Sequence, residues 1–136
     1  MTDPVALAKT HAAAFPHAPW SALTFANLLS KPGTVLEGDA TSFVLGRLTL
    51  DEAEILTLAT NPHHHRRGLA RARLTAFLDR VKALGATTVF LEVAEDNTAA
   101  QALYHHAGFA QVGTRPNYYG GANRRSVNAL ILRRNL

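Results

Sequence analysis

The sequence predicts a single domain of the α/β class, and three observations support this prediction. Residues 56–60 form an apolar, β-prone run, and apolar residues at helical spacing follow it closely. The stretch Thr87–Ala94 is apolar almost throughout, which is typical of a strand covered on both faces. The length of 136 residues suits one domain with its own core. We therefore expect two helices and an antiparallel meander, followed by a β–α–β crossover and a closing hairpin.

The N-terminal part of the chain predicts two helices and three strands. Asp3 is a suitable N-cap for the first helix, and Pro4 fits its first turn. The segment His17–Trp20 separates the helices, and Lys31–Gly33 forms a turn before the first strand. The expected elements are helices at Pro4–Phe15 and Ser21–Leu29 and strands at Val35–Leu36, Ser42–Leu50 and Glu54–Thr60.

The stretch Asn61–Gly85 predicts a binding site for an anion. A basic loop leads through Gly68 into a long amphipathic helix, and Gly85 stands where a C-cap glycine belongs. The first N–H groups of a helix have no partner within it and carry the positive end of its dipole, and Gly68 lets a ligand approach them. Additional positive charge comes from Arg66, Arg67 and Arg71. The pattern suits a phosphate or pyrophosphate, and it is equally compatible with ordinary helix capping beside a solvated charged face.

The C-terminal part of the chain predicts one more helix among strands. Asp96–Thr98 starts this short helix and Gly108 stops it. The expected elements are strands at Thr87–Ala94, Phe109–Gly113 and Val127–Leu132 and a helix at Ala99–Ala107. The residues Thr114–Arg125 are rich in glycine and asparagine, and we expect them to form a loop.

Composition excludes several classes of protein. The chain has no cysteine, which rules out a disulfide framework, a thiol nucleophile and a thiolate metal site. No apolar run reaches membrane-spanning length and the start does not resemble a signal peptide, so we expect a cytoplasmic protein. The net charge of +4 and the pI near 10.0 suit acidic ligands. A basic nucleic-acid-binding module without catalysis is one alternative, but no known binding motif accompanies the arginines.

Two polar residues stand out on otherwise apolar elements. Glu92 lies between Leu91 and Val93 in a predicted strand, where a carboxylate is costly to bury unless it is paired or has a catalytic task. It therefore predicts either an acid paired with an arginine or a general base. Tyr104 lies in the following helix on the side facing the strand end, and by residue type alone it is a core aromatic with a tethered hydroxyl.

Several motifs of this chain, in consecutive order, resemble those of the GNAT acetyltransferases. They are Asn61–Ala70, Leu91–Asn97, Ala102–Tyr104 and Ala107–Phe109. Within that superfamily the chain most resembles the RimI-type enzymes, which acetylate the N-terminal alanine of a small-subunit ribosomal protein. The segments His17–Ser21 and Arg115–Tyr119 add to this narrower resemblance. It implies a GNAT fold, with a mixed central sheet, a splayed strand pair and about four flanking helices.

The resemblance implies acetyl-CoA as the donor. Its pyrophosphate would bind the backbone N–H groups from Arg66 to Arg71, and its pantetheine would pair like an extra strand with Leu58–Thr60. The implied cofactor-binding residues are Leu58, Ala59, Thr60, His65, Arg66, Arg67, Gly68, Leu69, Ala70, Arg71 and Asn97. Asn97 would either cap the short helix or touch the cofactor. Glu92 falls on the position of the general base, and Tyr104 falls on that of the acid that protonates the departing thiolate.

On the acceptor side, the resemblance implies a primary amine, with a protein N-terminal α-amino group as the favoured acceptor. Trp20, Tyr118 and Tyr119 would line this side. The alternative is a GNAT enzyme that acts on a lysine side chain or a small-molecule amine. We expect a monomer or a homodimer and no membrane partner.

The chain departs from the family pattern at three places. His65 replaces the usual Gln or Arg that begins the pyrophosphate motif, although the backbone donors do not depend on it. Family members normally begin with a strand, whereas this chain begins at its first helix. We expect one GNAT domain over residues 1–136, in which either the sheet lacks its edge strand or the true start lies upstream. Near Ser126–Asn128 the acidic pair common in RimI-type chains is replaced.

The run His63–His65 suggests a metal site at first sight. Adjacent side chains diverge, and no further histidine or cysteine stands at a suitable ligand spacing. We therefore expect no metal.

Overall fold

The computed structural model describes residues 2–65, 68–121 and 124–136, and only the backbone within 119–121 and 124–125. One mixed sheet has the strand order β1-β2-β3-β4-β6-β5. Its strands are β1 (Thr34–Gly38), β2 (Ser42–Thr49), β3 (Glu52–Thr60), β4 (Thr88–Ala94), β5 (Ala110–Gly121) and β6 (Arg124–Asn135). The helices are α1 (Pro4–Ala14), α2 (Ala22–Leu29), α3 (Leu69–Ala83) and α4 (Thr98–His106), with a 3-10 turn η1 (Pro62–His64). The prediction of an α/β domain is confirmed.

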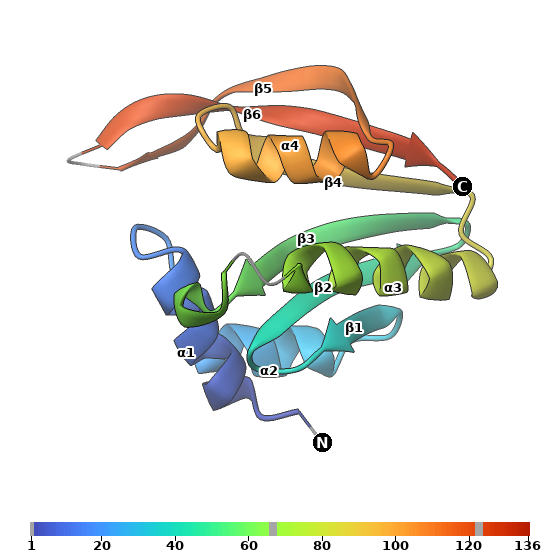
Figure 1. Cartoon of the computed structure of the whole chain (residues 1–136), viewed down its shortest axis with the longest axis horizontal. Helices are drawn as coiled ribbons and strands as arrows, with labels where there is room; N and C mark the ends of the chain where they lie inside the picture. Colours follow the sequence, from blue (N-terminus) through green and yellow to red (C-terminus); the bar gives the residue numbers. More distant parts are fainter. Residues whose placement is uncertain (1, 66–67, 122–123) are drawn as a thin grey trace.

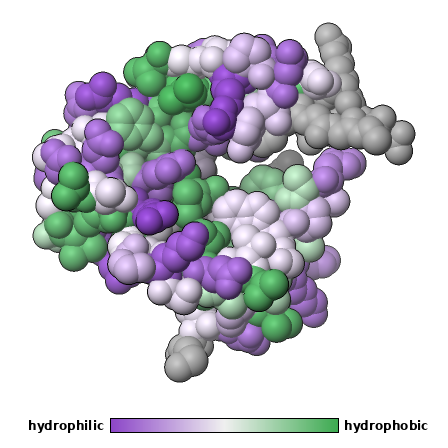
Figure 2. All heavy atoms as spheres, turned by 180° about the vertical axis from the view of Figure 1, so that it is seen from behind, coloured by the Kyte–Doolittle hydropathy of each residue, from purple (hydrophilic) through white to green (hydrophobic). Residues whose placement is uncertain are grey.

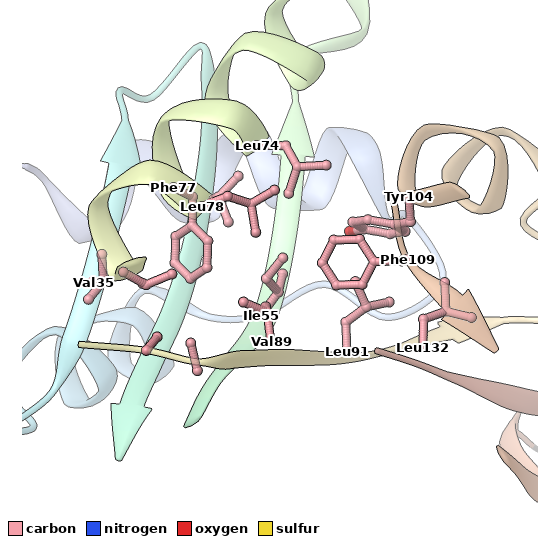
Figure 3. Close-up of a cluster of buried hydrophobic side chains, with 14 of the residues drawn as sticks. Val35, Ile55, Leu74, Phe77, Leu78, Val89, Leu91, Tyr104, Phe109 and Leu132 are labelled. Atoms are coloured by element: carbon pink, nitrogen blue, oxygen red, sulfur yellow. The ribbon is translucent and has the colours of Figure 1, made fainter. Parts of the chain in front are cut away.

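Helices cover both faces of the sheet (Figure 1). α3 and α4 lie on one face, where Phe77 of α3, Tyr104 of α4 and Leu91 of β4 belong to one large buried cluster (Figure 3). α1 and α2 lie on the other face, where Leu7 and Phe25 belong to a second cluster. Burying each such side chain contributes about 1.5–3 kcal/mol, so the two clusters fix the helices on the sheet.

A bulge in β3 changes which face its side chains reach. Leu45 of β2 stands opposite Thr57, and the next residue of β2 stands opposite Ile55, so Leu56 has no opposite residue on β2. Before the bulge, Ile55 packs in the cluster beneath α3 and α4. After it, Ala59 packs in the cluster beneath α1 and α2. An extra residue of this kind bends a strand and increases its twist.

The strands β3 and β4 are parallel, and they pair over only part of their length. The ladder runs from Glu52 opposite Thr88 to Ile55 opposite Leu91 and ends there. Figure 1 shows the two strands close together near their starts and diverging toward their ends. The later parts of β3 and β4 keep their outer partners, β2 and β6. The splayed strand pair implied by the family resemblance is therefore present.

The prediction of a loop at Thr114–Arg125 is wrong for most of that segment. β5 continues to Gly121 and β6 starts at Arg124, so the described backbone forms a long hairpin. Its register shifts between Arg115 and Tyr119, and Asn117 has a positive φ of 54°. Glycine, proline and asparagine lower the local strand propensity, but pairing with β6 overrides it.

The other predicted elements are correct to within a few residues. The central helix spans Leu69–Ala83, and the short helix spans Thr98–His106. Both predicted helix-stopping glycines adopt the left-handed region, with φ of 105° at Gly85 and 90° at Gly108. This conformation carries little penalty for glycine, which explains why the helices end there.

Gly46 of β2 lies directly against the ring of Phe77 of α3. A Cβ at this position would lie 2.3 Å from Cζ of Phe77 and 2.7 Å from the carbonyl oxygen of Glu54. We predict that Gly46→Ala lowers the free energy of unfolding by about 1–3 kcal/mol, because the added methyl overpacks the core. Urea denaturation measures this loss. The loss should be smaller in a Phe77→Leu background, and an equal loss in both backgrounds would show that the ring is not its cause.

Candidate active site

A cavity of about 660 Å³ opens where β3 and β4 separate. Residues 54–58 of β3, residues 91–94 of β4, part of α4 and the segment between α1 and α2 form its walls. Figure 2 shows the molecule hollowed between its two halves, with hydrophobic side chains at the inner end of the hollow. Because the cavity passes between two strands, side chains from both faces of the sheet reach it.

Glu92 reaches this cavity from the face covered by α1 and α2. Its neighbours Leu91 and Val93 pack in the cluster beneath α3 and α4, so the alternation of β4 directs Glu92 to the opposite face. Arg115 of β5 donates a hydrogen bond from Nη1 to Oε2 of Glu92 over 3.1 Å. The two side chains are 52% and 29% exposed, so this ion pair contributes at most about 1 kcal/mol. Of the two interpretations of Glu92, pairing with an arginine is therefore observed, and it leaves a carboxylate at the cavity wall.

Tyr104 reaches the same cavity from the other face. It is 7% exposed, and its ring lies 5.7 Å from that of Phe109 in an edge-on arrangement. Figure 3 shows Tyr104 projecting from α4 toward the side of the sheet where β3 lies. Both Tyr104 and Glu92 line the cavity. The carboxylate of Glu92 and the phenol of Tyr104 thus belong to the wall of one cavity, although they come from opposite faces of the sheet.

The N-terminus of α3 lacks the capping that the other α-helices have in the part of the chain that the structure describes. Asp3, Ser21 and Asn97 each accept a backbone hydrogen bond as N-cap residues of α1, α2 and α4. At α3 the N-cap is Gly68, with φ of 71° and no side chain to accept such a bond. A Cβ on Gly68 would meet nothing within 4 Å, so the space in front of the helix is open. The first N–H groups of α3 are therefore left for an external acceptor.

Those predicted anion-binding residues that the structure describes lie in or just before the first turn of α3. Leu69, Ala70 and Arg71 form its first turn, and the turn contains no acidic residue. His65 follows η1, and its backbone N–H donates to the carbonyl oxygen of Pro62. Arg66 and Arg67 lie outside the described residues. A second cavity, of about 760 Å³, lies between α3 and α4 and is lined by Arg71 at this end.

The side chains of the predicted pantetheine-binding residues of β3 pack against the two clusters or form a hydrogen bond within the sheet. Leu58 lines the cavity and packs against the cluster beneath α3 and α4. Ala59 is buried in the other cluster, and the hydroxyl of Thr60 lies 2.8 Å from that of Ser42. The backbone of these residues faces the gap beyond the end of the β3–β4 ladder. Asn97 caps α4 by accepting a hydrogen bond from Ala100 over 3.2 Å, while it also lines the cavity.

Aromatic residues close the face of the cavity that lies nearest to α1. Trp20 and Tyr118 both line it. The guanidinium carbon of Arg115 lies 4.3 Å from the centre of the Tyr118 ring, so Arg115 contacts both Tyr118 and Glu92. Tyr119 belongs to β5, but its side chain lies outside the described part of the chain.

His11 of α1 also lines the cavity, and the sequence analysis missed it. It is 3% exposed and lies against the rings of Phe15, Trp20 and Phe25, at 4.7, 4.9 and 5.6 Å between centroids. Burial lowers the pKa of His11 from 6.5 to about 4. A usable signal was present, because Leu7, His11 and Phe15 follow one another at intervals of four residues along the buried stripe of α1.

Among the described residues, no group of three or more histidine, cysteine, aspartate or glutamate side chains is placed to hold a metal ion. Within the same ranges, no helix is both long and apolar enough to cross a bilayer.

Comparison with known proteins identifies the family of this chain. Residues 11–109 match the model of the acetyltransferase (GNAT) family. The chain belongs to the GNAT acetyltransferase family. The match includes the strand split, the uncapped start of α3 and the helix that carries Tyr104. The predicted family and its N-acetyltransferase activity class are confirmed.

Several bacterial relatives share more than 30% identity with this chain, and two of them serve as examples. The ribosomal protein bS18-alanine N-acetyltransferase of Haemophilus ducreyi is 38% identical over 91 residues, which span 67% of this chain and 63% of that protein. The protein with the same activity from Escherichia coli (strain K12) is 35% identical over 118 residues, which span 84% of this chain and 79% of that protein.

Solved GNAT structures confirm the fold. The crystal structure of the ribosomal-protein-S18-alanine N-acetyltransferase from Escherichia coli has a TM-score of 0.88 and 32% identity, and the match covers 98% of this chain and 87% of that one. NAA60 of Arabidopsis thaliana, solved in complex with acetyl-CoA, has a TM-score of 0.84 at 19% identity, with coverage of 98% and 93%. At this lower identity the likeness concerns the fold alone.

We predict that His11 makes the stability of this GNAT domain depend on pH between about 4 and 6.5. The unfolded chain binds a proton at His11 near pH 6.5, whereas the folded chain binds it only near pH 4. Lowering the pH through this window therefore favours the unfolded chain, by up to about 3 kcal/mol, and stability is highest above pH 6.5. Urea denaturation of the wild type and His11→Gln across this range measures the effect, and the variant should show a flatter slope. Lys9→Gln, on an exposed position of the same helix, should keep the wild-type slope, and a wild-type slope in His11→Gln would refute the assignment.

Proposed function

We propose that this enzyme transfers the acetyl group of acetyl-CoA to a protein N-terminal α-amino group, and that the N-terminal alanine of ribosomal protein bS18 is the favoured acceptor. The observation that carries the proposal is the meeting of Glu92 and Tyr104 in one cavity at the strand split. This arrangement offers a carboxylate on one face of the sheet and a phenol on the other. An amine and a thioester could thus approach each other from opposite sides.

The donor fits the described residues. Its pyrophosphate would accept hydrogen bonds from the first N–H groups of α3, which no side chain caps. Its pantetheine would pair with the backbone of β3 at residues 58–60, beyond the end of the ladder to β4. Its nucleotide end would lie toward the cavity between α3 and α4, beside Arg71. Arg66 and Arg67 remain part of this proposal as sources of positive charge.

Glu92 would act as the general base. An α-amino group has a pKa near 7.7–8.0, so much of the acceptor arrives as an ammonium and must lose a proton before it can attack. The Glu92 carboxylate would take that proton, directly or through a water molecule. The pair with Arg115 holds the Glu92 carboxylate at the cavity wall, and its exposure lets an incoming ammonium compete for the same oxygen.

Tyr104 would act as the general acid. The neutral amine attacks the thioester carbonyl carbon, a C–N bond forms, the C–S bond breaks and the thiolate departs. The hydroxyl of Tyr104 would give that sulfur a proton. A backbone N–H of the splayed part of β3 would stabilise the oxyanion. The cluster beneath α3 and α4 holds Tyr104 in place without blocking its access to the cavity.

The choice of acceptor rests on the relatives that act on bS18 and on the aromatic wall formed by Trp20 and Tyr118. A lysine side chain or a small-molecule amine remains the alternative acceptor. Asn128 stands near the place where RimI-type chains carry an acidic pair, and its Oδ1 accepts a hydrogen bond from the N–H of Asn117. Asn128 therefore shapes the turn beside Tyr118 and adds no negative charge. Incubation with peptides that begin with the bS18 sequence, with lysine-containing peptides blocked at the N-terminus and with polyamines separates these acceptors.

We predict that acetyl-CoA stabilises the folded chain in a saturable way. A ligand present at about 100 times its Kd adds about 2.7 kcal/mol to the folded state, which a thermal shift detects. Adenosine 3′,5′-bisphosphate, which lacks the acyl-pantetheine arm, should produce a smaller shift at the same concentration. The absence of any shift with acetyl-CoA would contradict the proposed donor site.

We predict that Glu92→Gln and Tyr104→Phe each lower kcat by about 100-fold or more, because each removes a proton-transfer group. The affinity for acetyl-CoA, measured by titration calorimetry, should change by less than about threefold. Both substitutions are nearly isosteric, so the melting temperature serves as the control for folding. Equal losses of kcat and acetyl-CoA affinity in Glu92→Gln would show a structural role, and unchanged kinetics in Tyr104→Phe would remove it as the acid.

A further inference from the structure

We propose that His11 is a positioning residue for the acceptor side of the cavity, and that it sets the affinity for the acceptor by holding the backbone of Trp20 in place. The kinetic part of this inference rests on the proposed function. Its structural part concerns only the contacts of His11 with Trp20 and Thr57. The two parts can therefore be tested separately.

The two hydrogen bonds of His11 determine its tautomer. The backbone N–H of Trp20 donates to Nδ1 of His11 over 3.1 Å. Because that N–H can only donate, Nδ1 must be the unprotonated nitrogen of a neutral ring. The proton then lies on Nε2, which is 3.2 Å from the hydroxyl oxygen of Thr57 and donates to it. Both polar atoms of the ring are thus satisfied inside an aromatic cluster.

These hydrogen bonds join three parts of the cavity wall. His11 belongs to α1, Trp20 ends the segment between α1 and α2, and Thr57 is the first residue after the bulge of β3. All three residues line the cavity. The His11 and Trp20 rings also stack, with 4.9 Å between centroids and an angle of 21°. One side chain therefore fixes the position of the Trp20 segment relative to the strand that faces the donor.

Packing alone does not explain a histidine at this position. Leu7 and Phe15 occupy the same stripe of α1, and a leucine or phenylalanine would fill the site without the cost of burying two polar ring atoms. A buried polar group is compatible with stability only when its hydrogen bonds are made, and here both partners belong to the cavity wall. A histidine here thus packs less favourably than an apolar side chain would, but its hydrogen bond holds the Trp20 backbone in a defined position.

The two hydrogen bonds should matter unequally. Thr57 is also held by the ladder to β2, where it stands opposite Leu45, so β3 keeps its course without His11. The segment between α1 and α2 lies in no described strand, and the bond to Nδ1 is the described hydrogen bond of the Trp20 backbone, beside the contacts of its ring with His11 and Phe25. Losing the acceptor at Nδ1 should therefore displace Trp20 and weaken acceptor binding. Donor binding at α3 and residues 58–60 of β3 should be unaffected.

Two substitutions separate the two hydrogen bonds. Asparagine places its amide oxygen near the position of Nδ1, so His11→Asn keeps the acceptor for the Trp20 N–H and loses the donor to Thr57. Glutamine places its amide nitrogen near the position of Nε2, so His11→Gln keeps the donor to Thr57 and loses the acceptor for Trp20. Lys9→Gln, on an exposed position of α1, is the matched control.

The kinetic experiment measures acetyl transfer to a peptide with the bS18 N-terminal sequence at pH 7.5, using the full chain. In His11→Gln we expect KM for the peptide to rise about 5- to 10-fold, the effect of one lost hydrogen bond, with kcat and acetyl-CoA affinity within about twofold of the wild type. His11→Asn should stay within about twofold in all three quantities. Equal effects of both variants on KM, or a loss of kcat alone, would overturn the proposal.

A second readout does not depend on activity. Trp20 is the only tryptophan of the chain, so acrylamide quenching of its fluorescence reports on this one position. Quenching should increase in His11→Gln and remain at the wild-type level in His11→Asn and Lys9→Gln. If the wild type acetylates no N-terminal peptide but the quenching order holds, the proposed function fails and the positioning of Trp20 stands. Identical quenching in all four proteins would overturn the positioning itself.

Discussion

The separation of β3 from β4 beyond Ile55 and Leu91 is the constraint on which the site depends. A sheet opened in its interior leaves backbone N–H and C=O groups that need partners. Here each strand remains paired on its outer edge, β3 with β2 and β4 with β6. Only the facing edges are left, and they border a cavity where an extended ligand arm can complete them. The cavity therefore lies where the second half of the ladder between β3 and β4 is missing.

The two hydrophobic clusters explain why the opening persists. The cluster beneath α3 and α4 contains residues from both halves of the sheet, from Val35 to Leu132, and therefore ties the halves together. Among the described residues, the members of the cluster beneath α1 and α2 all precede Asn61, and none comes from β4. In this part of the chain the halves of the sheet are therefore joined on one face and diverge on the other. Trp20, which we propose to line the acceptor side, packs on this second face, and Glu92 reaches the cavity from the same face.

Much of the fold follows from local sequence, because its elements carry strong local signals. The amphipathic period of α3, the apolar run of β4 and the glycines at 85 and 108 sufficed to place these elements. The outer part of the hairpin of β5 and β6, within residues 114–125, was not predicted, since its glycine and asparagine residues are held in strands by long-range pairing. Family motifs indicated Glu92 and Tyr104, and the structure adds that both line one cavity.

His11 and Arg115 escaped prediction as site residues for a physical reason. A histidine on an apolar helix stripe looks like an ordinary core residue until its two partners are known, and those partners are 9 and 46 residues away in sequence. Arg115 reaches Glu92 across 23 residues, from a strand that local propensity did not indicate. Interactions that shape a site between distant strands depend on the register of those strands, and register is not visible in local pattern.

The pairing of Glu92 with Arg115 is consistent with a base that must exchange partners. A fully buried ion pair would hold its carboxylate against any competitor, because separating buried charges costs several kcal/mol. A pair exposed to 52% and 29% is weak, and water screens it. In the proposed reaction, an acceptor ammonium could therefore replace the guanidinium at Glu92 at little cost. Arg115 also lies over the ring of Tyr118, which gives the displaced guanidinium a second contact on the same wall. Because the pair is weak, Glu92 can release Arg115 and take up the proposed acceptor.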